Sequence, residues 1–222
     1  MDQGSRSADE YLMVGTIGLD NDAWQGGFYD DDLPAEWRIA SYSTLLRSVM
    51  LPADEWKKAA AEDWADDVDE AFRFLLEVDA QEIAALEALP QTLTDRVAGL
   101  VIRINRLPAD DMLIERLKAL ATRYPLCLDF APDIASDTAD SFCTRLEAAR
   151  LWRPAQQQQP LHSGALQIAI LAGEDLPQQR AVIAELERHI KAGGRAGVFH
   201  EQADNAAEQA QQTRLLAEMM GV

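Results

Sequence analysis

The chain has 222 residues, which is enough for one large domain or two small ones. Hydrophobic residues make up 48% of the chain and charged residues 26%, values typical of a soluble globular protein and too apolar for a disordered one. The formal net charge is -18, from 20 Lys and Arg against 38 Asp and Glu. This balance argues against nucleic acid and against anionic membrane surfaces as partners, because both need basic side chains.

The first ten residues are polar and charged, and no segment is apolar over the roughly 18–20 residues that a membrane span needs. We therefore expect a flexible N-terminal tail over residues 1–10, a single domain over residues 11–222 and a cytoplasmic protein. The two cysteines, Cys127 and Cys143, are expected to be buried free thiols, since a disulfide framework needs more cysteines than two.

The acidic residues gather in two stretches. Residues 9–36 hold eight acids and no base, and residues 54–82 hold eleven acids against three bases. Such runs usually form a solvated surface that keeps a protein soluble, and we expect an acidic rim here. A surface for a basic protein partner is the alternative.

Eight short apolar runs, bounded by glycine, proline or charged residues, predict buried β-strands. They cover residues 11–17, 45–51, 71–78, 99–105, 126–130, 151–154, 166–171 and 196–200. The run at 151–154 is the weakest, because it is short and ends in Pro154.

Helical patterns lie between these runs. Apolar residues recur at helical spacing from Leu113 to Ala121, Pro177 opens a second helix that Gly193 ends, and a last helix is predicted over 203–220. Strands that alternate with helices are parallel strands joined by helical crossovers. We therefore predict a compact TIM-type (β/α)8 barrel with short loops, and keep an open doubly wound parallel sheet as the alternative.

The common cofactor and nucleophile motifs are missing from the sequence. It has no phosphate-binding G-x-x-x-x-G-K-[ST] loop, no G-x-G-x-x-G, no G-x-S-x-G and no C-x-x-C. No cofactor is therefore expected. Of the three histidines, only His200, beside Glu201, falls at the end of a predicted strand, where barrel enzymes place their chemistry.

Several short motifs stand near the two ends of the chain. Toward the N-terminus they are Gly15-Thr-Ile-Gly18, Trp24-Gln-Gly-Gly-Phe-Tyr29, Leu33-Pro34, Glu36-Trp37, Pro52, Trp56 and Phe72-Arg-Phe74. Toward the C-terminus they are Val198-Phe199 and the alanines at 206, 207 and 210. These motifs are similar to those of the YecE-like family, the domain of unknown function 72. The resemblance implies a soluble TIM-type barrel of bacterial type whose activity is not established.

The chain also departs from that family at the ends of three strands. Where the family carries V-E-x-N-x-T-F-Y in its second strand, the matched segment 42–50 has Ser43 and Leu45 in place of the acid and the amide. Ile170 and Ala172 replace the Arg and His of the seventh strand, and His200-Glu201 replaces the Asn pair of the eighth. These changes predict a divergent member that has lost or changed the ancestral site and acts as a binding or accessory module.

The candidate ligand-binding residues are polar or aromatic side chains in the predicted strands or just beyond their ends. They are Asp20, Trp24, Tyr29, Arg47, Glu77, Asn105, Arg106, Asp129, His200 and Glu201, with Asp79 in the same setting. Residues at these ends line the mouth at which parallel α/β proteins bind ligands.

An enzyme acting on a small anionic or phosphorylated substrate at this mouth is the alternative function. In it, Glu77 and Asp129 form a carboxylate pair for general acid/base work, and Arg47 or Arg106 holds the anion. A metal site at Asp129, His200 and Glu201 is a third interpretation. The structural alternatives are an Arg–carboxylate ion network and an aromatic cluster of Trp24, Phe28 and Tyr29 that packs over the strand ends.

Overall fold

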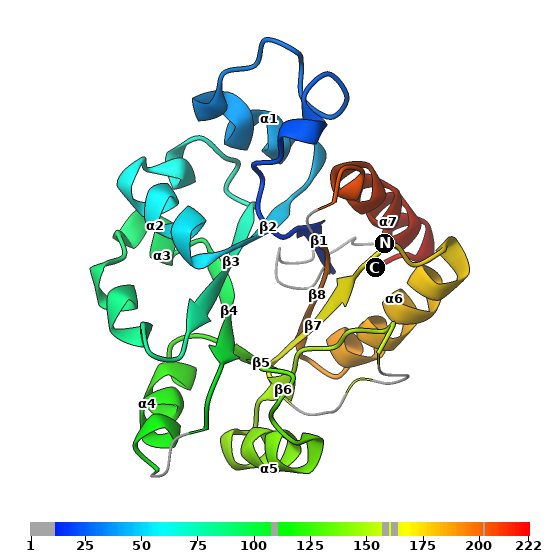
Figure 1. Ribbon diagram of the computed structural model, residues 1–222. Coiled ribbons are helices and arrows are strands. Elements are labelled where there is room, and N and C mark those ends of the chain that lie inside the picture. Colours follow the sequence, from blue (N-terminus) through cyan, green and yellow to red (C-terminus); the bar gives the residue numbers. More distant parts are fainter. Residues whose placement is uncertain (1–11, 108–110, 157–159, 161–163, 202) are drawn as a thin grey trace, which may run out of the picture.

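The computed structural model describes residues 12–107, 111–156, 160, 164–201 and 203–222. The predicted flexible tail, residues 1–10, lies outside this part. The described chain is an α/β protein with two parallel sheets, and helices lie around the strands (Figure 1). The predicted class, parallel strands alternating with helices, is confirmed.

All strand pairs are parallel. One sheet has the order β1-β8-β7, formed by β1 (Met13–Thr16), β8 (Arg195–His200) and β7 (Leu166–Leu171). The other has the order β2-β3-β4-β5-β6, formed by β2 (Ser48–Leu51), β3 (Arg73–Asp79), β4 (Val97–Ile104), β5 (Leu126–Phe130) and β6 (Ala149–Arg150). Isolated parallel bridges between Ile17 and Met50 and between Trp152 and Ala169 connect the two sheets.

The α-helices follow the strands in chain order. They are α1 (Arg38–Leu45), α2 (Ala53–Ala61), α3 (Gln91–Thr94), α4 (Met112–Ala121), α5 (Ser136–Leu146), α6 (Leu176–Lys191) and α7 (Ala206–Met220). Short 3-10 turns cover residues 22–24, 35–37, 64–66 and 83–88. Between β6 and β7 the described residues contain no helix. Within the described chain, no helix combines the length and apolarity needed to cross a membrane.

The predicted helix signals act as expected in α6 and α7. The Asp175 side chain accepts from the Gln178 backbone N–H in a reciprocal capping box, and α6 ends before Gly193, which adopts a φ of 90°. Ala206, Ala207 and Ala210 are buried where α7 packs on β1 and β8, because small side chains let the helix approach closely.

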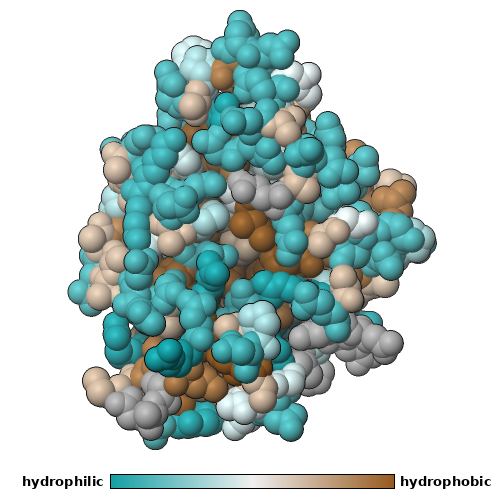
Figure 2. Space-filling view, in the orientation of Figure 1, coloured by the Kyte–Doolittle hydropathy of each residue, from teal (hydrophilic) through white to brown (hydrophobic). Residues whose placement is uncertain are grey.

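The core has an outer and an inner part. Two outer clusters fill the space between the sheets and the helices. An inner cluster draws residues from both sheets: Met13, Met50, Leu75, Ala98, Val101, Cys127, Leu151, Leu166, Ile168, Ile170 and Phe199. Hydrophobic residues are accordingly visible in the centre of the largely hydrophilic face in Figure 2. Cys127 and Cys143 are buried free thiols, as expected.

Two predicted strands differ from the structure by three residues or more, and four others differ by one or two residues at an end. The run 45–51 forms a strand only from Ser48, since α1 continues to Leu45. Tyr42 holds that helix against the sheet: its hydroxyl accepts from the Thr16 N–H and donates to the Ser48 carbonyl. The run 151–154 follows β6 rather than forming it, and only Trp152 pairs, with Ala169.

Gly15 is required by the contact between β1 and β2. A Cβ at this position would lie far inside van der Waals distance of the Ser48 carbonyl oxygen and 3.0 Å from the Tyr42 hydroxyl. We expect Gly15→Ala to lower the free energy of unfolding by roughly 2–4 kcal/mol, since two strands must separate to admit the methyl group. Urea denaturation measures the change.

Gly27→Ala is the matched control. A Cβ there would meet the Glu208 carboxylate at 3.6 Å, an ordinary contact. An equal loss of stability in both variants would contradict the close approach at Gly15.

Candidate functional site

A layer of charged side chains follows the inner cluster at the carboxyl ends of the strands. Successive side chains of a strand alternate between its two faces, so a residue two positions beyond an inner-cluster residue lies on the same face. Applied to Leu75, Val101, Cys127, Leu151 and Phe199, this rule gives Glu77, Arg103, Asp129, Arg153 and Glu201. These five residues are called the charged layer below.

Ion pairs join most of the charged layer. Arg103 Nη1 lies 2.9 Å from Glu77 Oε1. Arg153 donates to both carboxylate oxygens of Asp129, with distances of 2.8 and 3.1 Å. Next to them, the Asn105 amide donates to the Asp79 carboxylate. Of the predicted residues, the structure thus brings Glu77, Asp79, Asn105 and Asp129 together.

The pKa shifts follow from burial and pairing. Burial raises the pKa of Glu77, Arg103 opposes the rise, and the neighbouring Asp129 adds to it. The hydrogen bonds from Arg153 to Asp129 raise the pKa of Arg153, and Glu201 contributes to the same rise. Within the charged layer, Arg153 thus binds Asp129 through two hydrogen bonds, and the pKa of Glu77 lies above its ordinary value.

A hollow of about 450 Å³ opens beside the charged layer, at the carboxyl ends of β4, β5 and β6. Its lining includes Arg103, Arg150 and Arg153 and a single carboxylate, Asp129. Arg150 is held by Ser136 Oγ at 2.7 Å and by Asp140 at 3.3 Å, and it lies over the Phe130 ring. We call this cavity the β4–β6 hollow. Its cationic lining stands out in a chain with a net charge of -18.

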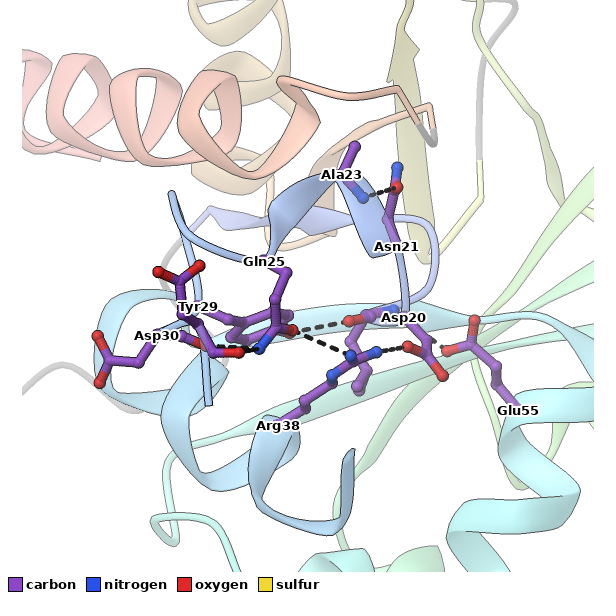
Figure 3. A network of polar contacts seen from close by, with 10 residues as sticks. Asp20, Asn21, Ala23, Gln25, Tyr29, Asp30, Arg38 and Glu55 are labelled. Atoms are coloured by element: carbon purple, nitrogen blue, oxygen red, sulfur yellow. Dashed lines mark hydrogen bonds and ion pairs between the residues drawn. The ribbon is translucent and has the colours of Figure 1, made fainter. Parts of the chain in front are cut away.

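A second polar network covers the ends of β1 and β2 (Figure 3). Arg38 forms an ion pair with Asp20 and donates to Gln25 Oε1 at 3.1 Å. Gln25 in turn donates to the Asp30 carbonyl at 2.6 Å. These contacts position the loop after β1 on α1.

Glu55, at the start of α2, fixes the same loop. Its carboxylate accepts from the Leu19 N–H at 3.2 Å. Burial raises the pKa of Glu55 to about 7, and the nearby Asp54 adds to the rise. The carboxyl group therefore changes charge near neutral pH.

The aromatic candidates are buried in the core. Trp24 and Tyr29 are each 1% exposed, and Phe28 packs edge-on against both. The Trp24 indole N–H donates to the Ala203 carbonyl at 3.0 Å, and the Tyr29 hydroxyl donates to the Leu19 carbonyl at 2.8 Å. Their polar atoms thus tie the loop after β1 to the rest of the protein.

His200 and Glu201 point in opposite directions from the end of β8. His200 is 1% exposed and faces α6 and α7, where its Nε2 lies 2.8 Å from Thr213 Oγ1 and Thr213 donates to Gln179. Burial lowers the pKa of His200 to about 4. The structure therefore does not bring His200 to Glu201 and Asp129, and no group of three or more metal-ligating side chains occurs in the described ranges.

The two arginines predicted to hold an anion lie elsewhere. Arg47 precedes β2, at the amino-terminal ends of the strands, opposite the charged layer. Arg106 follows β4 with an exposed side chain, and it is not part of the described lining of the β4–β6 hollow.

Sequence reasoning missed Arg103, Arg150 and Arg153. Arg103 and Arg153 each stand two positions after an inner-cluster residue, and this spacing could have indicated them. The spacing is informative only when it is known which face of the strand points inward. The comparison of strand ends also used a wrong segment: Ser43 and Leu45 lie in α1, not in β2. The loss was expected at the second, seventh and eighth strands, whereas the charged side chains gather mainly at β3 to β6, which that comparison did not cover.

Of the comparisons with known proteins, only that with solved structures finds a match, and this match concerns the fold. No protein-family model matches the chain, and no curated protein matches it significantly. Among solved structures, the chain is similar to a DUF72 family protein from Enterococcus faecalis V583, with a TM-score of 0.58 and 10% sequence identity over 96% of this chain and 98% of the other. The likeness predicted from the sequence motifs is thus confirmed at the level of the fold.

The raised pKa of Glu55 makes stability depend on pH in a defined direction. Between about pH 4.5 and 7 the folded state retains a proton that the unfolded state has lost, so stability falls as the pH rises through this window. Glu55→Gln removes the ionisation and keeps an acceptor for Leu19. We expect the variant to be more stable than the parent at pH 8, by about 1–3 kcal/mol, and nearly equal to it below pH 5.

Urea denaturation at pH 5 and pH 8 measures this difference. Glu36→Gln, at an exposed position in the turn before α1, is the control. Its stability relative to the parent should be the same at both pH values. A Glu55→Gln effect that does not change with pH would show that the carboxyl group titrates in its ordinary range.

Proposed function

We propose that the protein is a binding module for a small anionic ligand, which it holds in the β4–β6 hollow. The observation that carries the proposal is the lining: three arginines and one carboxylate surround a cavity of about 450 Å³. Guanidinium groups donate paired hydrogen bonds to carboxylate and phosphate groups, and a hollow of this size suits a small molecule.

The state of the remaining groups supports binding rather than chemistry. Asp129 forms an ion pair with Arg153, and His200 faces away from the hollow. Burial raises the pKa of Cys127 above its ordinary range and that of Cys143 to about 12, so neither thiol is a ready nucleophile. The described lining of the hollow thus offers three guanidinium groups, each also in an ion pair with a carboxylate, and contains neither a histidine nor a thiol.

Binding of inorganic phosphate tests the proposal. Isothermal titration at constant ionic strength should give saturable binding, and Arg103→Gln should weaken it by about tenfold or more, since one charge-assisted donor is lost. Arg116→Gln, at an exposed position on α4, is the matched control and should bind phosphate like the parent. Absence of saturable binding, or equal binding by Arg103→Gln, would refute the proposal.

An enzyme acting on a small anionic or phosphorylated substrate is the second candidate. It is favoured by one observation, the raised pKa of Glu77 beside the Asp129 carboxyl group, because two neighbouring carboxyl groups in different environments can act as an acid/base pair. Hydrolysis of p-nitrophenyl phosphate, in which water adds to phosphorus and p-nitrophenol leaves, would support this candidate over a binding module. That turnover should then be lost in Glu77→Gln while phosphate binding remains.

We also propose that the two sheets close into one (β/α)8 barrel and that the chain is a divergent member of the DUF72 family. The strand order supports closure: β2 to β6 pair in chain order, and the first strand, β1, pairs with the last, β8. The bridges Ile17–Met50 and Trp152–Ala169 occur where the two sheets meet. An open doubly wound sheet, in contrast, reverses its strand order near the middle. The motifs at both chain ends and the shared fold support the family.

A further inference from the structure

A second cavity lies at the opposite end of the strands. It has a volume of about 330 Å³ and is formed by the amino-terminal ends of β1, β2 and β3 together with the end of α7. Its lining is Leu12, Met13, Val14, Arg47, Ser48, Ala71, Arg73, Arg214, Ala217, Glu218 and Val222. We call it the basal cavity. In barrel-like folds this end usually serves stability, so polar groups gathered here need a separate explanation.

One part of the basal cavity is cationic. The described lining includes Arg47, Arg73 and Arg214 and a single carboxylate, Glu218. Arg214 donates through Nη1 to the Leu45 carbonyl at 2.7 Å, while its buried Nε has no hydrogen-bond partner in the described chain and lies 3.5 Å from Glu218. The Arg47 side chain is exposed, and within the described residues no hydrogen bond or ion pair holds it. Guanidinium donors therefore remain available to a ligand.

The other part of the cavity is apolar. Leu12, Val14 and Ala217 belong to the outer cluster between β1 and the last two helices, and Val222 packs against that cluster. Leu12, Val14 and Ala217 are already 8%, 4% and 2% exposed, so they leave little surface open, and Val222 beside them is partly buried. A ligand with an apolar body would cover what these side chains leave open at the cavity.

The local charges favour a ligand with one negative charge. Glu218 lines the cavity, and α7 ends there, so the negative end of its helix dipole lies close by. Both disfavour a dianion, whereas three arginines favour one acidic group. We propose that the basal cavity binds an organic carboxylate with an apolar chain, its carboxylate at Arg47 and Arg214 and its chain on Leu12, Val14 and Ala217.

Octanoate, acetate and 1-octanol are the probes, because they separate the two halves of the proposed ligand. Isothermal titration of the full chain should show saturable binding of octanoate, and binding of acetate and of 1-octanol that is at least about tenfold weaker. Arg47→Gln should weaken octanoate binding by about tenfold, since a charge-assisted contact is lost, while the control Arg116→Gln should leave it unchanged.

Three results would each overturn the proposal: no saturable octanoate binding, equal binding of acetate and octanoate, or octanoate binding that Arg47→Gln does not alter. Arg103→Gln separates the two cavities. It should impair phosphate binding and leave octanoate binding intact. Phosphate with Arg103→Gln thus tests the β4–β6 hollow, and octanoate with Arg47→Gln tests the basal cavity.

Discussion

The alternation of side chains along parallel strands is the constraint on which this structure depends. Helices cover one face of each strand, so that face is buried and mostly apolar, and its polar exceptions, such as Thr16 and His200, are hydrogen-bonded. The other face meets the inner cluster, which is apolar only as far as the side chains of the opposite strands reach. Beyond that depth the side chains are nearer the solvent, and an ionised group costs less free energy there than in the core. Glu77, Arg103 and Asp129 can therefore follow apolar residues at a spacing of two.

Local sequence signals predicted the elements better than their positions in space. The apolar runs of β5 and β7 were bounded by proline and glycine, and both strands were predicted with the bounds that the structure shows. The run beginning at Leu45 misled the prediction because tertiary contacts of Tyr42 extend α1 into it. Patterns of period two cannot say which face points inward, so the direction of His200, toward the helices, was not predictable from β8 alone.

The two cavities show how an acidic chain can still present cationic sites. Most of its carboxylates lie on the outer surface, whereas six arginines are held at the two ends of the strands, three in each cavity. At one end they alternate with carboxylates in ion pairs, and at the other they border apolar core. Because the surrounding surface is negative, an anion gains most where it is shielded from that surface, inside a cavity.

The burial of His200 between β8 and α7 has a consequence for the response of the fold to acid. The buried imidazole of His200 stays neutral until the pH nears 4, whereas the unfolded chain takes up the proton near pH 6.5. The free energy of unfolding therefore decreases as the pH falls through this interval. Glu55 acts in the opposite sense over nearly the same interval. The contributions of His200 and Glu55 to the pH dependence of the free energy of unfolding therefore oppose each other, and replacing one group would leave the contribution of the other.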